Sequence, residues 1–153
     1  MASPEPPPLP EPQDLLLLTT ARITRLQDQV LASLDVSLTN RQYRVLTRIE
    51  QGFTSPTKLA RLARRSLPTL SETIEGLVKR GLVDRTPSAE DRRAVVLALT
   101  SKGRKALRDA ELQMTTLAND LTSALTAEEA DDLASHLKVL FMTAESRLES
   151  LAS

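Results

Sequence analysis

The chain has 153 residues, 41% of them hydrophobic and 26% charged, which is typical of one globular domain and excludes a disordered or collagen-like protein. It contains no cysteine and one histidine, His136, so disulfides, thiolate catalysis and a metal centre built from cysteine and histidine are excluded. The formal net charge is zero, but residues 41–108 sum to +10 between segments of −3 and −7. This pattern is typical of proteins that bind an anionic polymer, although solvated helix faces would also produce it.

Residues 1–14 are predicted to form a disordered tail. Six of the first twelve residues are proline, which removes amide donors and favours extended geometry; a proline-rich ligand for another protein is the alternative. The tail has no lysine, arginine or apolar stretch, so it does not resemble a secretory signal. The longest aliphatic run, residues 15–18, is far shorter than the roughly 20 apolar residues that cross a bilayer. A cytoplasmic protein is therefore expected.

Two helices are expected after the tail. Residues 16–34 repeat apolar side chains at intervals of three, four and seven, which predicts a long amphipathic helix. Thr39 and Gln42 have the spacing of a capping box, which predicts that a second helix begins there. Gly52 lies where a glycine can end that helix.

Two shorter helices follow. The first is expected over residues 56–64, with Leu59 and Ala60 facing inward. Ser66 is a strong N-cap residue for the second, whose first turn tolerates Pro68 because its amides have no helical acceptor. At 100° per residue, the buried side of this second helix is formed by Leu70, Ile74, Leu77 and Val78.

After residue 81 the spacing of apolar side chains changes from the helical period to the alternation of strands, and it later returns to the helical period. Residues 82–85 and residues 95–99 are predicted to be two strands, joined by the polar loop 86–93. Apolar side chains over residues 107–121 return to the helical period, and Thr126 and Glu129 begin a final helix with a second capping box.

Two helices joined by a tight turn and followed by a two-stranded wing form a winged helix-turn-helix, whose second helix can enter a DNA major groove. The predicted fold class is mainly α with a small β-wing. The same residues resemble the multiple-antibiotic-resistance regulator (MarR) family, and the resemblance is carried by residues 38–46 (LTNRQYRVL), 77–85 (LVKRGLVDR), 91–94 (DRRA) and 99–103 (LTSKG).

The resemblance implies a homodimeric transcription regulator that binds double-stranded DNA at a pseudo-palindromic operator, and a repressor released by a small anionic or aromatic ligand. Residues 37–103 would form the DNA-binding domain, and residues 15–36 and 104–151 the helical dimerisation region. Apolar stripes on both terminal helices exceed what one small winged domain can cover, although an intramolecular bundle is the alternative. The predicted dimer interface comprises Leu16, Ile23, Leu26, Val30, Leu133, Leu137, Leu140, Phe141 and Leu148.

The predicted DNA-binding surface has three parts. The recognition helix would present Pro68, Thr69, Ser71, Glu72, Gly76 and Lys79 to base edges. The wing would carry Asp91, Arg92 and Arg93; the resemblance makes Arg93 the minor-groove contact, with Asp91 orienting an arginine. Phosphate contacts, which fix the register without reading sequence, are expected from Ser55, Thr57, Lys58, Arg61, Arg64 and Arg65.

Glu72 departs from the family pattern, in which a basic residue is common at this position. A carboxylate is repelled by phosphate but accepts a hydrogen bond from cytosine N4, so Glu72 either reads a cytosine or disfavours other sequences. An ion pair with Arg65 or Lys79 is an equally weighted alternative.

Four arginines in the first two predicted helices are candidates for binding a ligand. Arg22, Arg25, Arg41 and Arg44 could hold an anionic ligand, or act as solvated charges or phosphate contacts.

No phosphate loop and no hydrolase or metalloprotease motif occurs, so no cofactor and no enzymatic activity are expected. The alternative function is a winged-helix dimer that serves as a protein-interaction module without sequence-specific DNA binding.

Overall fold

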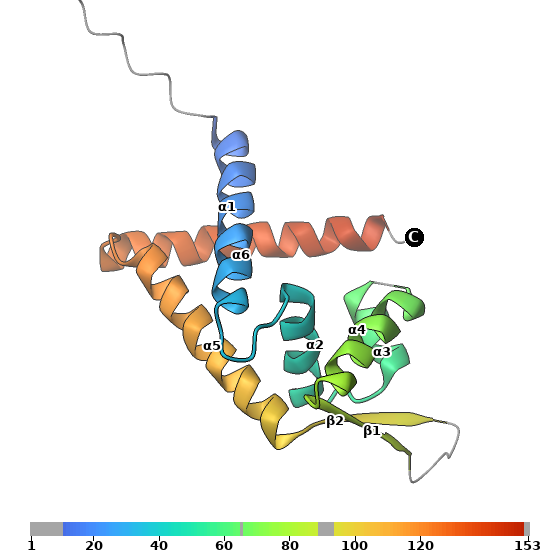
Figure 1. Cartoon of the computed structure of the whole chain (residues 1–153). Coiled ribbons are helices and arrows are strands. Elements are labelled where there is room, and N and C mark those ends of the chain that lie inside the picture. Colours follow the sequence, from blue (N-terminus) through green and yellow to red (C-terminus); the bar gives the residue numbers. More distant parts are fainter. Residues whose placement is uncertain (1–10, 65, 89–93, 152–153) are drawn as a thin grey trace, which may run out of the picture. The chain divides into compact units, whose positions relative to one another are not determined.

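The computed structural model describes residues 11–64, 66–88 and 94–151. The elements in chain order are α1 (Pro12–Ala32), α2 (Asn40–Glu50), α3 (Pro56–Ala63), α4 (Leu67–Lys79), β1 (Val83–Pro87), β2 (Val95–Leu99), α5 (Ser101–Thr122) and α6 (Ala127–Ser150) (Figure 1). The predicted fold class, mainly helical with a two-stranded antiparallel wing, is confirmed.

The chain divides into two compact units between Met114 and Thr115. The core of the first unit is apolar and combines side chains from α1 to α5 and both strands, with Leu31, Leu46, Leu59, Ile74, Leu77, Leu82 and Leu97 inaccessible to solvent. The second unit contains the end of α5 and the whole of α6, and no residue of α6 is buried in the single chain.

The predicted helix caps are confirmed. The Thr39 hydroxyl accepts from the Gln42 amide at 3.1 Å, and the Gln42 side chain accepts from the Thr39 amide at 3.1 Å. Thr126 and Glu129 form the second capping box, and the hydrogen bonds from Thr126 hold the pKa of Glu129 below its usual value. Ser66 caps α4, accepting from the Thr69 amide. These interactions satisfy amides that have no acceptor within the helix.

Two predicted boundaries differ from the structure. Helix α1 begins at Pro12, so residues 12–14 of the predicted tail are helical, because proline lacks the amide that a first turn leaves unpaired and Asp14 favours the positive helix end. Residues 1–10 lie outside the described residues. Strand β1 covers residues 83–87 rather than 82–85, since its pairing runs from Val83 opposite Leu99 to Pro87 opposite Val95.

The core of the first unit includes residues from outside the predicted DNA-binding domain. Leu31 of α1 and Ala106, Leu107 and Ala110 of α5 belong to the same core as the winged helix-turn-helix. The first compact unit accordingly extends to Met114. None of the helices in the described ranges is long and apolar enough to cross a membrane.

Gly103 lies at the closest approach between α5 and the wing. A Cβ built on Gly103 would lie 1.9 Å from the backbone oxygen of Leu82. The approach is fixed by Thr100, whose hydroxyl donates to the Gly81 carbonyl at 2.7 Å and accepts from the Gly103 amide at 2.9 Å. The 99–103 motif thus has a structural role: it joins the end of β2 to α5.

Gly103→Ala is expected to lower the free energy of unfolding by about 1 to 3 kcal/mol, because the added methyl group must displace backbone. Gly76→Ala is a matched control: a Cβ there meets only the Gln42 side chain, at 3.9 Å, and alanine raises helix propensity, so unchanged or increased stability is expected. Urea unfolding monitored by circular dichroism measures both. Equal stabilities for the two variants would contradict the close approach at Gly103.

Candidate nucleic-acid interface

The helix-turn-helix is formed by α3 and α4, which contact each other (Figure 1). Both helices contribute to the apolar core, α3 with Leu59 and Ala60 and α4 with Leu70 and Ile74. The turn between them depends on Arg64, which adopts the left-handed conformation with φ 48°. It is the single non-glycine residue with positive φ in the described part of the chain. Nothing in the sequence signalled this conformation, which glycine or asparagine adopts more readily.

The exposed face of α4 is more acidic than predicted. Pro68, Glu72 and Lys79 are exposed and Ser71 is half-buried. Glu75 is also exposed, one turn from Glu72, and sequence reasoning overlooked it. Glu72 forms no ion pair with Lys79 or with any other described residue. The alternative partner, Arg65, lies outside the described residues.

Thr69 and Gly76, also predicted for the recognition surface, are half-buried, as Ser71 is. The Thr69 hydroxyl lies 2.8 Å from the Ser66 hydroxyl, and Gly76 faces the side chain of Gln42 in α2. The two residues flank buried Thr73 on the helix surface.

The predicted phosphate contacts gather on α3. Ser55 is the N-cap of α3 and accepts from the Lys58 amide at 3.5 Å. Thr57, Lys58 and Arg61 are exposed. Arg64 is exposed at the end of the helix, and Arg65 lies outside the described residues. The described cations thus follow one short helix, an arrangement suited to contacts with phosphates.

The wing residues Asp91, Arg92 and Arg93 lie outside the described residues. The hairpin ladder extends as far as Ser88, whose amide donates to the Ala94 carbonyl at 2.8 Å. In the middle of β2, the Leu97 amide donates to the Thr54 carbonyl at 2.9 Å. The wing is therefore attached to the loop between α2 and α3.

Arg80 holds the end of α4 and was not predicted as a functional residue. Its guanidinium donates to the Gln42 side chain at 3.1 Å and to the Ser37 carbonyl. Its carbonyl accepts from the Lys102 ammonium at 3.0 Å. Arg80 therefore connects α4 with the start of α2, the preceding loop and the start of α5.

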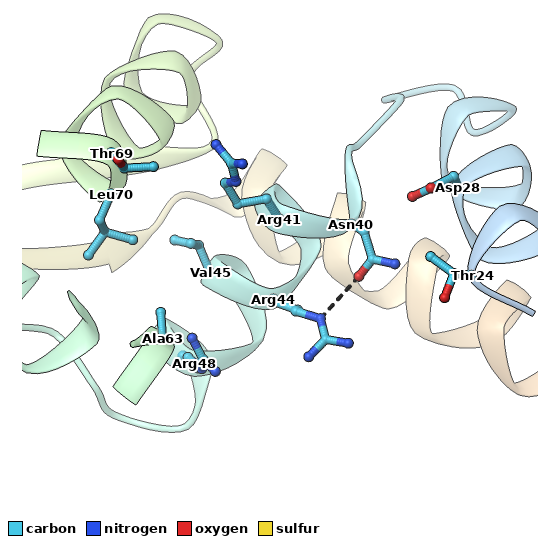
Figure 2. Close-up of a pocket in the computed structure, with 10 residues that line it drawn as sticks. All are labelled: Thr24, Asp28, Asn40, Arg41, Arg44, Val45, Arg48, Ala63, Thr69 and Leu70. Atoms are coloured by element: carbon cyan, nitrogen blue, oxygen red, sulfur yellow. Dashed lines mark hydrogen bonds between the residues drawn. The ribbon is translucent and has the colours of Figure 1, made fainter. Parts of the chain in front are cut away.

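A cleft of about 430 Å³ opens between α1, α2 and the start of α4 (Figure 2). Arg41 and Arg44, two of the arginines considered for an anionic ligand, line it, whereas Arg22 and Arg25 do not. Arg48 is a third lining arginine that sequence reasoning missed. Burial, and secondly the charge of Arg44, lower the pKa of Arg48.

The predicted dimer-interface residues are mostly exposed in the single chain. On α1, Leu16 and Leu26 are exposed and Ile23 and Val30 are half-buried. On α6, all five predicted residues are exposed: Leu133, Leu137, Leu140, Phe141 and Leu148. His136, on the same helix, places Nδ1 2.7 Å from the Asp132 carbonyl oxygen.

The comparisons with known proteins identify the family. The MarR family model matches residues 38–95. The multiple antibiotic resistance protein MarR of Escherichia coli is 30% identical over 126 residues, which cover 81% of this chain and 86% of that protein. The chain belongs to the MarR family. It is therefore a transcription regulator with a winged-helix DNA-binding fold, and not an enzyme.

Solved structures of MarR-family proteins share this fold. A mutant MarR from E. coli complexed with operator DNA has a TM-score of 0.69 at 28% identity and covers 84% of this chain and 91% of that chain. Streptococcus pneumoniae FabT in complex with DNA has a TM-score of 0.79 at 19% identity and covers 88% and 95%. The second comparison concerns the fold alone.

Proposed function

We propose that this MarR-family regulator acts as a homodimer that binds a pseudo-palindromic operator, represses transcription and is released by a small ligand. The observation that carries the proposal is the exposed face of α4 beside the cations of α3, within a segment whose formal charge is +10. Recognition by α4 would supply base contacts, and α3 would supply phosphate contacts. The relative solved on its operator supports this arrangement.

The dimer follows from the apolar residues of α6. A helix with no buried residue that carries seven exposed large apolar side chains from Leu133 to Leu148 has unburied apolar surface. A two-fold dimer would bury it and present two copies of α4 to two half-sites. The predicted roles of residues 15–36 and 104–151 in dimerisation belong to this proposal.

The test is fluorescence anisotropy with a duplex from the intergenic DNA beside the gene, a scrambled duplex as control, and two stated salt concentrations. Preference of about a thousandfold, with one dimer per palindrome, is the expected result. An unbiased oligonucleotide selection follows if the intergenic duplex shows no preference. Failure of that selection to enrich any sequence would contradict the proposal.

The alternative, a protein-interaction module, is favoured by one observation. Glu72 and Glu75 place two carboxylates on the exposed face of α4, where phosphates would repel them. Weak binding that ignores sequence and depends little on salt would support this alternative, because specific operator binding neutralises several phosphates.

Glu72→Gln is expected to change the base preference at one operator position by about 1 to 3 kcal/mol, because a carboxylate accepts a hydrogen bond from cytosine N4 whereas a glutamine amide pairs with adenine. The salt dependence of binding should stay almost unchanged. Glu75→Gln is the matched control on the same face. Affinities for a set of single-base operator variants measure the effect. A changed salt slope with unchanged preference would contradict base reading by Glu72.

A further inference from the structure

The end of α4 is bonded to three other segments of the first compact unit. One nitrogen of the Arg80 guanidinium donates to the Gln42 side-chain oxygen at 3.1 Å, and the other terminal nitrogen donates to the Ser37 carbonyl. From α5, the Lys102 ammonium donates to the Arg80 carbonyl at 3.0 Å. Arg80 and these three partners, Ser37, Gln42 and Lys102, form what we call the Arg80 anchor.

The chemistry of these contacts indicates a geometric role for Arg80. Both acceptors of its guanidinium are neutral, and no carboxylate of the described residues lies within 4.0 Å of it. A planar guanidinium donates from separate nitrogens in fixed directions, so it can hold two acceptors at a set distance. Arg80 therefore fixes the end of α4 against the start of α2 and does not neutralise a local negative charge.

Gln42, the acceptor in α2, is itself held in place. Its side-chain oxygen also accepts from the Thr39 amide at 3.1 Å, within the capping box of α2. Because Thr39 and Arg80 are both donors, they orient the amide with its oxygen toward them. The position of this acceptor is thus determined by the first turn of α2.

The contact between the end of α4 and the start of α5 is equally well defined. The Thr100 hydroxyl donates to the Gly81 carbonyl at 2.7 Å, and the Thr100 amide donates to the Leu82 carbonyl at 3.1 Å. Together with the bond from Lys102 to Arg80, three consecutive carbonyls after α4 are therefore bonded to residues at the start of α5. Helix α5 belongs to the region proposed for dimerisation, so these bonds connect that region to the recognition helix.

Even a small tilt of α4 would alter DNA binding. The helix has 13 residues, so it is about 20 Å long, and a tilt of about 10° displaces one end relative to the other by roughly 3 Å. One base pair adds roughly 3.4 Å to the distance between two half-sites. Loss of the Arg80 anchor would therefore change the separation of two α4 helices by an amount comparable to the rise of one base pair.

We propose that Arg80 is a positioning residue for operator recognition. The Arg80 anchor holds α4 in one orientation relative to α5, and the dimer thereby selects operators by the spacing of their half-sites. Arg80 acts through α4 and does not touch DNA. The selection of spacing rests on the proposed function, whereas the orientation of α4 in the free protein does not, so each is measured separately.

The first measurement is the distance between α4 and α5 in the free protein. The chain has no cysteine, so Glu75→Cys and Glu111→Cys, at two exposed positions, provide the sites for nitroxide labels. Excess unlabelled chain suppresses distances between protomers. Double electron–electron resonance is expected to give one narrow distance distribution, which Arg80→Ala and Lys102→Ala should each broaden. Arg80→Lys should broaden it as well, because an ammonium has one donor nitrogen in place of two.

Lys105→Ala is the matched control for Lys102→Ala. Lys105 lies three residues further along α5 and donates to Asp109 at 2.7 Å, so the variant loses the same charge without disturbing the Arg80 anchor. Lys102 and Lys105 are both exposed, so neither replacement creates a cavity. The control should keep the narrow distance distribution, and circular dichroism confirms that each variant is folded.

The second measurement is operator affinity as a function of spacing, with fixed half-sites and one base pair inserted or removed between them. The wild type and Lys105→Ala are expected to prefer one spacing by at least about tenfold, because an added base pair shifts and rotates a half-site. Arg80→Ala should reduce this preference to about threefold or less, with an unchanged slope of log affinity against log salt. A slope reduced by about 0.9 would instead make Arg80 a phosphate contact and overturn its positioning role.

The two measurements separate the Arg80 anchor from the proposed function. Unchanged distance distributions in Arg80→Ala and Lys102→Ala, or equal broadening by Lys105→Ala, would overturn the anchor, and wild-type operator binding would then leave the proposed function intact. Broadened distributions with an unchanged preference for spacing would overturn the role of Arg80 in operator selection. Broadened distributions in a chain that binds no operator would support the anchor and overturn the proposed function.

Discussion

Leu140→Asp is expected to convert the dimer to a monomer and to weaken operator binding by at least about a hundredfold. Leu140 is 42% exposed on α6 in the single chain, within the apolar stripe that the proposed dimer buries. An aspartate there would become an unpaired charge in an apolar interface, at a cost of several kcal/mol. Light scattering after size-exclusion chromatography measures the mass, and anisotropy measures the affinity.

The matched control is Ser135→Asp, the same change from a neutral to an acidic residue on the same helix. Ser135 is exposed and lies away from the apolar stripe, with its hydroxyl bonded to the Asp131 carbonyl at 3.0 Å. This variant should remain dimeric and bind the operator normally. A wild-type chain that is monomeric at micromolar concentration would instead favour the intramolecular bundle, and a dimeric Leu140→Asp variant would place the interface elsewhere.

Features that depend on neighbouring residues could be predicted from the sequence. The capping boxes at Thr39 and Thr126 and the cap at Ser66 use side chains three residues apart, so a short motif contains the whole interaction. The alternation of side chains over residues 95–99 predicted the second strand of the wing. Its first strand was misplaced because its extent is set by pairing with β2, whose residues lie eight (Pro87 to Val95) to sixteen (Val83 to Leu99) positions further along the chain.

Features that depend on distant residues could not be predicted. The approach of Gly103 to Leu82 and the hydrogen bond from Arg80 to Gln42 each join segments that only the fold brings together. The surroundings of Gly76, in the candidate site, also depend on a distant residue. A helical wheel placed it near the outer face of α4, but it faces Gln42 of α2, which the wheel of α4 does not contain.

The cleft lined by Arg41, Arg44 and Arg48 is another feature that depends on distant residues. Arg41 and Arg44 were noticed as charges near an expected helix start, together with Arg22 and Arg25 of the preceding helix. The structure separates these pairs: α2 contributes a third arginine, Arg48, while α1 contributes Thr24 and Asp28 to the opposite wall. Charge alone did not distinguish a residue that lines a cleft from one that faces solvent.

Arg93→Ala is expected to weaken specific operator binding by about 1 to 3 kcal/mol. Residue 93 lies outside the described residues, and the prediction rests on the resemblance and on the hairpin that leads to it: the ladder holds as far as Ser88 and Ala94. A guanidinium carried by a wing loop can enter a narrow minor groove, where the negative potential is enhanced. Anisotropy with operators whose A·T content differs beneath the wing measures the effect.

Arg85→Ala separates groove insertion from loss of a positive charge. Arg85 is an exposed residue of β1 in the same hairpin, so this variant loses the same charge without removing the proposed groove contact. Both variants should bind scrambled DNA slightly more weakly, since each loses one cation. Only Arg93→Ala should lose preference for operators with a narrow minor groove. If the two variants lose equal affinity for every duplex, the wing contributes charge alone, and specificity resides in α4.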